Sequence, residues 1–183
     1  MNVPAILWVG ILTFVTLLAP PASAKPPAGA KAPVSAATSD DEALLDALQG
    51  RWFMVGTLDG RSVQYRAEGR RVLQGAFMRL RLTDAAPRSR YEAEVFLGFD
   101  PKRRDYVVHW LDRFGAAGAR VIAEGERAGD QLVVTFPADE GDFRDTFTWH
   151  PLSQTWSLLI ESQGINGEWT TFASFILSRD SRH

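Results

Sequence analysis

The chain has 183 residues, a formal net charge of −2 and no cysteine. A nearly neutral chain with neither a basic patch nor an acidic tail does not fit a nucleic-acid-binding protein. Without cysteine the protein forms no disulfide, and it lacks the residue to which bacterial lipoproteins attach their lipid, so its core must hold the fold together.

The first 24 residues are predicted to be a signal peptide. Residues 3–19 carry no charge and are mostly Ile, Leu, Val and Phe, and Ala22-Ser23-Ala24 forms a small-x-small cleavage site. The apolar run is slightly short for a transmembrane helix, which needs about 20 apolar residues. We therefore expect an exported protein, periplasmic or secreted, with no stable membrane span after cleavage. The start of the segment lacks Lys and Arg, which leaves an uncleaved amino-terminal anchor as the alternative.

A linker and a short helix are expected before the main domain. Residues 25–39 are rich in Pro and Ala and have too little apolar surface to bury, so they are predicted to form a disordered linker. Ser39 and Glu42 form a capping box, which predicts the start of a helix, and Gly50 is the signal for its end. The apolar stripe of this helix consists of Leu44, Leu45 and Leu48. Such a stripe needs a surface to cover, and the open end of a barrel is the expected place.

From Trp52 to Leu177 the sequence is a succession of short strands separated by turn residues. The expected strands are 51–58, 62–67, 71–82, 90–99, 105–112, 119–126, 131–136, 142–150, 155–162 and 168–177. The third is expected to bend or break near Gly75. Turns such as Asp59-Gly60 are so short that neighbouring strands must be antiparallel. The predicted fold of residues 40–179 is therefore an all-β, antiparallel up-and-down barrel, lipocalin-like, of about ten strands with a short N-terminal helix.

Strand alternation places the large side chains inside the barrel. The expected inner face includes Tyr91, Ala93, Val95, Leu97, Phe99, Tyr106, Val108, Trp110, Asp112, Phe143, Asp145, Phe147, Trp149, Trp156, Leu158, Ile160, Ser162, Trp169, Thr171, Ala173, Phe175 and Leu177. The opposite faces carry Arg, Glu and Thr, as expected of a solvent face. The inner aromatic residues either fill the barrel or line a cavity for an apolar or planar ligand.

Six residues are candidates for ligand binding: Arg79, Trp110, Asp112, Asp145, Trp149 and Trp169. The two aspartates share the inner face with aromatic residues, where a carboxylate needs a partner or a proton. They either anchor a ligand or act as general acid and base, or else lie near strand ends, where they contact solvent, cap a turn or pair with Arg79 or Arg113. Arg79 is expected on the outer face, and it clamps a carboxylate ligand only if the register slips by one residue.

No recognisable catalytic motif is present. The chain has no nucleophile elbow, no dinucleotide-binding glycine motif and no phosphate loop. Its three histidines, His109, His150 and His183, are far apart in the sequence, and the chain has no cysteine that could act as a further ligand. No metal or cofactor is therefore expected. No residue is assigned a catalytic role, and the sequence leans away from an enzyme.

Short motifs with a characteristic order run through the domain. They are Leu73-x-Gly75-x-Phe77-Met78, Leu97-Gly98-Phe99-Asp100, Tyr106 to Asp112 followed by Gly115, and Gly167-Glu168-Trp169 before a last strand ending at Ser178-Arg179. Over about residues 48–179 the chain thereby resembles a bacterial family known as domain of unknown function 1579. The resemblance implies a calycin-like or lipocalin-like antiparallel barrel, and it brings no established activity and no catalytic residues.

Three functions stay open at this point. The first is binding of a small hydrophobic or amphipathic ligand inside the barrel, with Trp110, Trp149 and Trp169 as walls and Asp112 or Asp145 as anchor. The second is a filled barrel whose outer surface binds a protein partner that the sequence does not identify. The third is an enzyme that uses the inner carboxylates. We favour them in this order.

Overall fold

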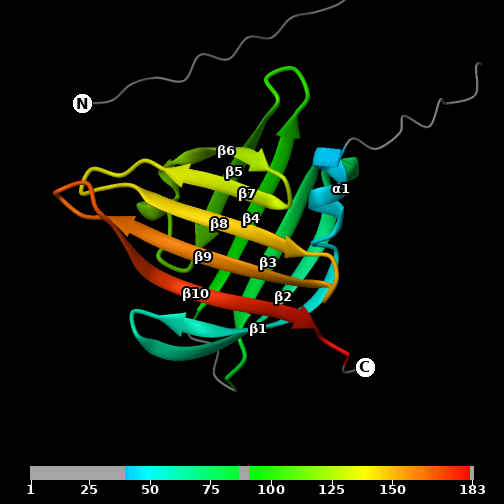
Figure 1. The fold of residues 1–183 in the computed structure, drawn as a ribbon, viewed down its shortest axis with the longest axis horizontal. Helices are drawn as coiled ribbons and strands as arrows, with labels where there is room; N and C mark the ends of the chain where they lie inside the picture. The colour runs from blue at the N-terminus through cyan, green and yellow to red at the C-terminus, as the bar shows by residue number, and fades with distance from the viewer. Residues whose placement is uncertain (1–39, 87–90, 182–183) are drawn as a thin grey trace, which may run out of the picture. The chain divides into compact units, whose positions relative to one another are not determined.

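Ten antiparallel strands close into a barrel in the computed structural model, which describes residues 40–86 and 91–181 (Figure 1). The strands are β1 (Gly50–Leu58), β2 (Arg61–Val72), β3 (Phe77–Asp84), β4 (Glu92–Asp100), β5 (Asp105–Asp112), β6 (Ile122–Ala128), β7 (Gln131–Phe136), β8 (Phe143–His150), β9 (Thr155–Gln163) and β10 (Trp169–Arg179). Each pairs with its neighbours in the chain, and β1 also pairs with β10. The predicted all-β, antiparallel up-and-down barrel is confirmed.

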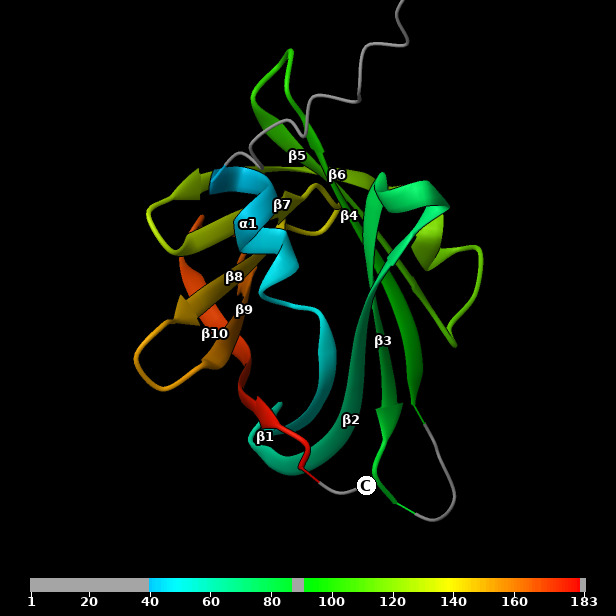
Figure 2. The ribbon, with the colours of Figure 1, turned by 90° about the vertical axis from the view of Figure 1, so that its right-hand side faces the viewer.

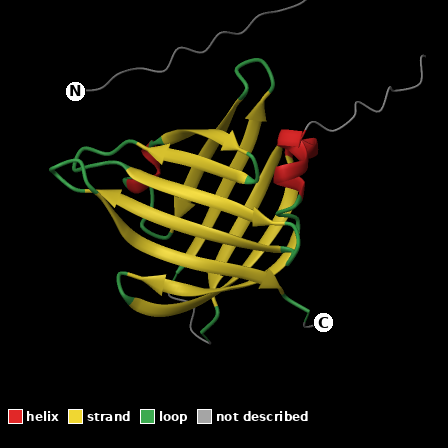
Figure 3. Ribbon diagram, in the orientation of Figure 1, coloured by secondary structure: helices red, strands yellow, loops and turns green. Residues whose placement is uncertain are grey.

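Figure 3 shows how completely strands dominate the domain, with α1 (Asp40–Asp46) as its one α-helix among the described residues. The expected signal peptide and linker, residues 1–39, lie outside the described residues, and so does Ser39 of the expected capping box. Within the described part of the chain, no helix has the length and apolar character to cross a membrane.

Pairing of the first and last strands closes the barrel. The register runs from Trp52 opposite Arg179 to Leu58 opposite Ala173. Between β1 and β2, Asp59 and Gly60 both have positive φ, as a two-residue type I′ hairpin turn requires. Because every strand that the structure describes has two partners, none of them is left as a sheet edge on which another chain could add.

Alternation along the strands fills the interior as predicted. On β4, Ala93, Val95 and Leu97 are all at most 1% exposed, while Glu92 and Glu94 face outward and pair with arginines of β3. Apolar side chains from all ten strands form one continuous core, to which β6 contributes only Ala123. Burial of this apolar surface is the main stabilising contribution in a chain that has no disulfide.

The second and third strands differ from the sequence-based boundaries. β2 continues through Gly69, which lay between the expected strands 62–67 and 71–82, and the chain reverses at the short 3-10 turn η1 (Leu73–Gly75), where the expected break near Gly75 is confirmed. Residues 71–72 therefore belong to β2 rather than to the third strand. Gly69 is needed for close approach and not for a turn, since a Cβ atom there would overlap the backbone carbonyl of Leu48.

The last strand contains a β-bulge between Thr171 and Ala173. Ala173, Phe175 and Leu177 beyond the bulge face inward and are buried, as expected. Before the bulge the alternation is reversed, because a bulge places an extra residue on one strand. Thr171 lies opposite Glu161 of β9, which faces outward, so its predicted inner position is wrong.

Helix α1 covers one end of the barrel, as the apolar stripe predicted (Figure 2). Leu44, Leu45 and Leu48 are each at most 5% exposed. Two indoles fasten the helix and the residues that follow it: Trp52 Nε1 donates to the Leu48 carbonyl at 2.8 Å, and Trp156 Nε1 donates to the Ala47 carbonyl at 3.3 Å.

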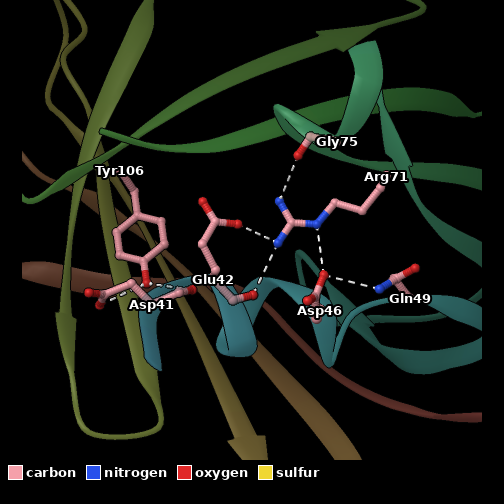
Figure 4. A network of polar contacts seen from close by, with 7 residues as sticks. All are labelled: Asp41, Glu42, Asp46, Gln49, Arg71, Gly75 and Tyr106. Carbon is pink, nitrogen blue, oxygen red and sulfur yellow. Dashed lines mark hydrogen bonds and ion pairs between the residues drawn. The ribbon is translucent and has the colours of Figure 1, made fainter. Parts of the chain in front are cut away.

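A polar network fixes the outer side of α1 (Figure 4). Arg71 on β2 donates from Nη2 to Glu42 Oε2 at 2.5 Å and from Nε to Asp46 Oδ1 at 2.7 Å. Tyr106 on β5 donates its hydroxyl to Asp41. The helix is thus tied to both β2 and β5.

Candidate functional site

The interior is hollow in the half of the barrel away from α1. A cavity of about 640 Å³ lies there, between the strand ends and the loops of that end. Its lining residues are Met54, Leu58, Tyr65, Leu82, Asp84, Tyr91, Trp110, Asp112, Arg113, Phe114, Gly118, Val121, Phe136, Phe143, Asp145, Ile160, Phe172 and Phe175. The volume is typical of sites that bind small organic molecules, which occupy roughly 300–1,000 Å³.

Aromatic rings make up much of the cavity wall. The Tyr65 ring lies 5.6 Å from Tyr91 and 5.8 Å from Phe175 between ring centroids, and Trp110 packs edge-on against Phe136 at 6.5 Å. Their inward direction follows from strand alternation. The rings contact one another at the distances of favourable aromatic pairs while still bordering an open space.

The polar atoms of the aromatic wall are held as neutral groups. Trp110 Nε1 donates to the Tyr91 hydroxyl at 3.2 Å. Burial raises the pKa of Tyr91 well above its usual value of 10, a rise that the Trp110 hydrogen bond partly offsets. Burial, with a smaller contribution from the Asp84 charge, also raises the pKa of Tyr65. Both phenols therefore stay protonated in neutral solution.

Asp145 is the one buried charged residue among those described, with 3% of its surface exposed. Its cross-strand neighbours are Val134 on β7 and Ile160 on β9, which are apolar. Within the described residues no hydrogen bond or ion pair reaches its carboxyl group. Burial raises the pKa of this carboxyl from its usual 3.8 to about 7. Asp145 thus contributes an unpaired carboxyl to the cavity, close to the neutral–charged transition at physiological pH.

Asp112 has the role that its position near a strand end suggested. Its Oδ1 accepts a hydrogen bond from the Phe114 backbone N–H at 2.9 Å, so it caps the turn after β5. Asp84 caps the turn after β3 in the same way, through the Ala86 N–H at 2.9 Å. Both carboxylates line the cavity, and so does the exposed Arg113.

Three of the six predicted binding residues line this cavity: Trp110, Asp112 and Asp145. Trp149 instead lies toward the α1 end, where it packs against Trp52 and Trp156 with centroids 6.4 and 5.3 Å apart. It is therefore part of the filled core and not a cavity wall. Its strand alternation was predicted correctly, but alternation does not say at which end of the barrel the space lies.

Arg79 and Trp169 lie outside the barrel. Arg79 is on the outer face of β3, with Nη1 3.8 Å from Glu94 Oε1, so the register that would turn it inward does not occur. Trp169 precedes the bulge in β10, and its ring stacks on the outward-facing Arg144 guanidinium at 4.2 Å. The prediction that Trp169 faces inward is wrong because the bulge reverses the alternation.

Sequence reasoning missed several wall residues. Phe172 lines the cavity because it occupies the bulge, and nothing in the alternation marks that position. Phe114 and Val121 belong to the β5–β6 connection, which strand patterns do not describe. Tyr65, Tyr91 and Phe143 carried a usable signal, because each is an inward aromatic residue close to the cavity end of its strand.

The carboxylates that the structure describes give no sign of a metal centre. Among the described residues, no group of three His, Cys, Asp or Glu side chains is arranged to hold a metal ion. His109 contacts the Ala119 carbonyl and His150 contacts Ser157, and neither lines the cavity. Burial alone accounts for the raised pKa of Asp145, whereas a carboxylate pair would raise it by mutual repulsion.

Fold and site together define a closed antiparallel β-barrel with an aromatic cavity at one end. The chain belongs to the family described as "Protein of unknown function (DUF1579)", whose model matches residues 38–179. This match confirms the resemblance inferred from the short aromatic motifs. No curated protein matches the chain.

Proposed function

We propose that this domain binds a small hydrophobic or amphipathic molecule in the barrel cavity. The observation that carries the proposal is the cavity of about 640 Å³, whose lining is mostly aromatic and aliphatic with a few polar groups. Binding sites for small molecules have this composition, because apolar walls supply affinity and a few placed polar groups orient the ligand.

The mouth of the cavity supports the same function. Phe114 is 74% exposed and lies 6.3 Å from the Tyr91 ring, and Phe172 is 38% exposed beside Phe143. Aromatic residues that border both solvent and a cavity offer an entering apolar molecule a surface to contact first.

The two alternatives have less support. A filled barrel acting through its outer surface does not need a cavity, whereas this barrel has one of about 640 Å³. An enzyme using the inner carboxylates needs two carboxyl groups around one reacting centre. Asp112 is committed to a turn and Asp145 stands among apolar neighbours. The domain therefore fits a binding protein better than an enzyme.

The test is binding of the neutral dye Nile red, followed by its fluorescence, to the wild type and two tryptophan variants. Ile160→Trp adds an indole at the cavity wall and is expected to weaken dye binding at least tenfold. Ile176→Trp is the matched control, because Ile176 is 52% exposed on the outer face of β10. Dye binding by the control should equal that of the wild type.

Two results would contradict the proposal. One is the absence of saturable dye binding by the wild type. The other is equal weakening by Ile160→Trp and Ile176→Trp, which would place the dye on the outer surface. Circular dichroism of each variant separates lost binding from lost folding.

A further inference from the structure

We infer that the ligand carries a positively charged group, such as a protonated amine, on an apolar body, and that Asp145 is its counter-ion. This inference rests on the proposed function and adds the chemical class of the ligand. An inward Arg79 would have selected a negatively charged ligand. The described cavity wall instead contains carboxyl groups, which select a positively charged one.

The first argument is the unsatisfied state of Asp145. The residue is 3% exposed, lines the cavity, and has Val134 and Ile160 as its cross-strand neighbours. Within the described residues no donor reaches its carboxyl group. Burying a carboxyl group without a partner costs free energy. A ligand with a hydrogen-bond donor or a positive charge removes this cost when it binds, and so gains affinity that other ligands do not.

The second argument is the charge balance of the cavity wall. Among the described residues that line it, Asp84, Asp112 and Asp145 are acidic and Arg113 is the single cationic residue, with an exposed side chain. A low-dielectric cavity whose charged groups are mainly acidic attracts cations and repels anions. Fatty acids and other carboxylate amphiphiles are therefore disfavoured, even though they match the apolar walls.

The third argument is the aromatic composition around these carboxyl groups. Tyr65, Tyr91 and Trp110 line the same cavity as Asp145, and the Asp145 and Asp112 charges both act on the Tyr91 hydroxyl. Aromatic faces attract an ammonium group through their quadrupole, and the attraction increases when the cation is removed from water. An ammonium group near Asp145 thus gains a counter-ion and aromatic contacts together.

The test compares three ligands that share one apolar chain and differ only in head group: decylamine, 1-decanol and decanoic acid. Each displaces Nile red at pH 7.5, below its critical micelle concentration. We expect the amine to bind at least tenfold more tightly than the alcohol, and the acid to bind most weakly. In Asp145→Asn the ratio of amine to alcohol affinity should fall to within about twofold of one.

The matched control is Asp130→Asn, which removes a carboxylate from the exposed β6–β7 turn without touching the cavity. It should keep the wild-type preference for the amine. An unchanged amine preference in Asp145→Asn, or its loss in Asp130→Asn as well, would overturn the assignment of Asp145.

The affinities of the wild type for the three ligands test the charge of the ligand by themselves, so the inference does not depend on the folding of a variant. Equal or tighter binding of decanoic acid than of decylamine would overturn the cationic class while leaving the proposed function intact. Failure of all three ligands to displace the dye, or failure of the dye itself to bind, would instead count against the proposed function.

Discussion

Asp145 is the residue at which strand pattern and electrostatics conflict. Alternation with Phe143 and Phe147 places its carboxyl inside the barrel, where two apolar cross-strand neighbours surround it. The sequence predicts this placement, because alternation is a local property. It does not predict the missing partner, because which strands lie beside β8 and which side chains they present is a property of the whole barrel.

The raised pKa of Asp145 predicts an unusual pH dependence of stability. The carboxyl titrates near 3.8 in the unfolded chain and near 7 in the folded protein, so the folded state binds more protons between these values. Unfolding free energy must then fall as pH rises through this range. From pH 5 to pH 8 we expect this group to lower it by about 2–3 kcal/mol.

The Asp145→Asn variant tests this prediction, because Asn keeps the shape and stays neutral at every pH. Urea unfolding at pH 5 and pH 8 should show a gain in stability for the variant that is larger at pH 8. A variant whose stability relative to the wild type is the same at both values would contradict the raised pKa. Asp130→Asn should leave the wild-type pH dependence unchanged, since Asp130 is exposed.

At the scale of single elements, the sequence predicts the regular strands and misses their irregularities. β5 and β7 begin and end where expected, because alternation and flanking turn residues agree there. Glycine is typical of turns, but Gly69 lies within β2, where the backbone of Leu48 passes too close to leave room for a Cβ atom. The bulge in β10 depends on pairing with β9, so Trp169 and Phe172 exchange the faces that a local pattern gives them.

The attachment of α1 to the barrel is expected to depend on Arg71. This side chain is 17% exposed and bonds both Glu42 and Asp46, so its removal leaves two carboxylates without their shared partner. Arg71→Ala should lower the unfolding free energy by about 1–3 kcal/mol, the range for hydrogen bonds to charged groups. Amide exchange of α1 should accelerate more than that of the strands.

Arg70→Ala is the matched control for this element. Arg70 is the preceding residue on β2, its side chain is exposed on the outer face, and it lies opposite Arg79. Its removal should change stability by no more than about 0.5 kcal/mol. Equal effects of the two substitutions, or an unaltered exchange rate of α1 in Arg71→Ala, would show that the apolar stripe alone holds the helix.

At the scale of the whole molecule, the barrel is predictable from the sequence and the cavity is not. Ten short strands with short turns leave few arrangements other than an up-and-down barrel. Whether its interior is filled depends on how side-chain volumes add up across strands far apart in the chain. Trp52, Trp149 and Trp156 concentrate at the α1 end, and this uneven distribution leaves the other half hollow.

We expect residues 1–24, which lie outside the described part of the chain, to direct export of the protein. Cleavage after Ala24 would release a protein that begins with the Pro/Ala-rich residues 25–39 and continues into the barrel. Intact-mass measurement on the exported fraction of an expressing bacterium should give the mass of residues 25–183. Ala24→Trp places a large residue at the cleavage site and should leave the full-length mass in the membrane fraction.

Ala36→Trp is a control for that substitution, because it adds the same side chain beyond the cleavage site and should be processed normally. A wild-type protein recovered at full length in the membrane fraction would establish the uncleaved anchor instead. The absence of cysteine is consistent with either outcome, since the barrel needs no disulfide to fold on either side of a membrane. If the domain is exported, its cavity would meet ligands outside the cytoplasm, and the preference for the amine should then be measured at the pH of that compartment.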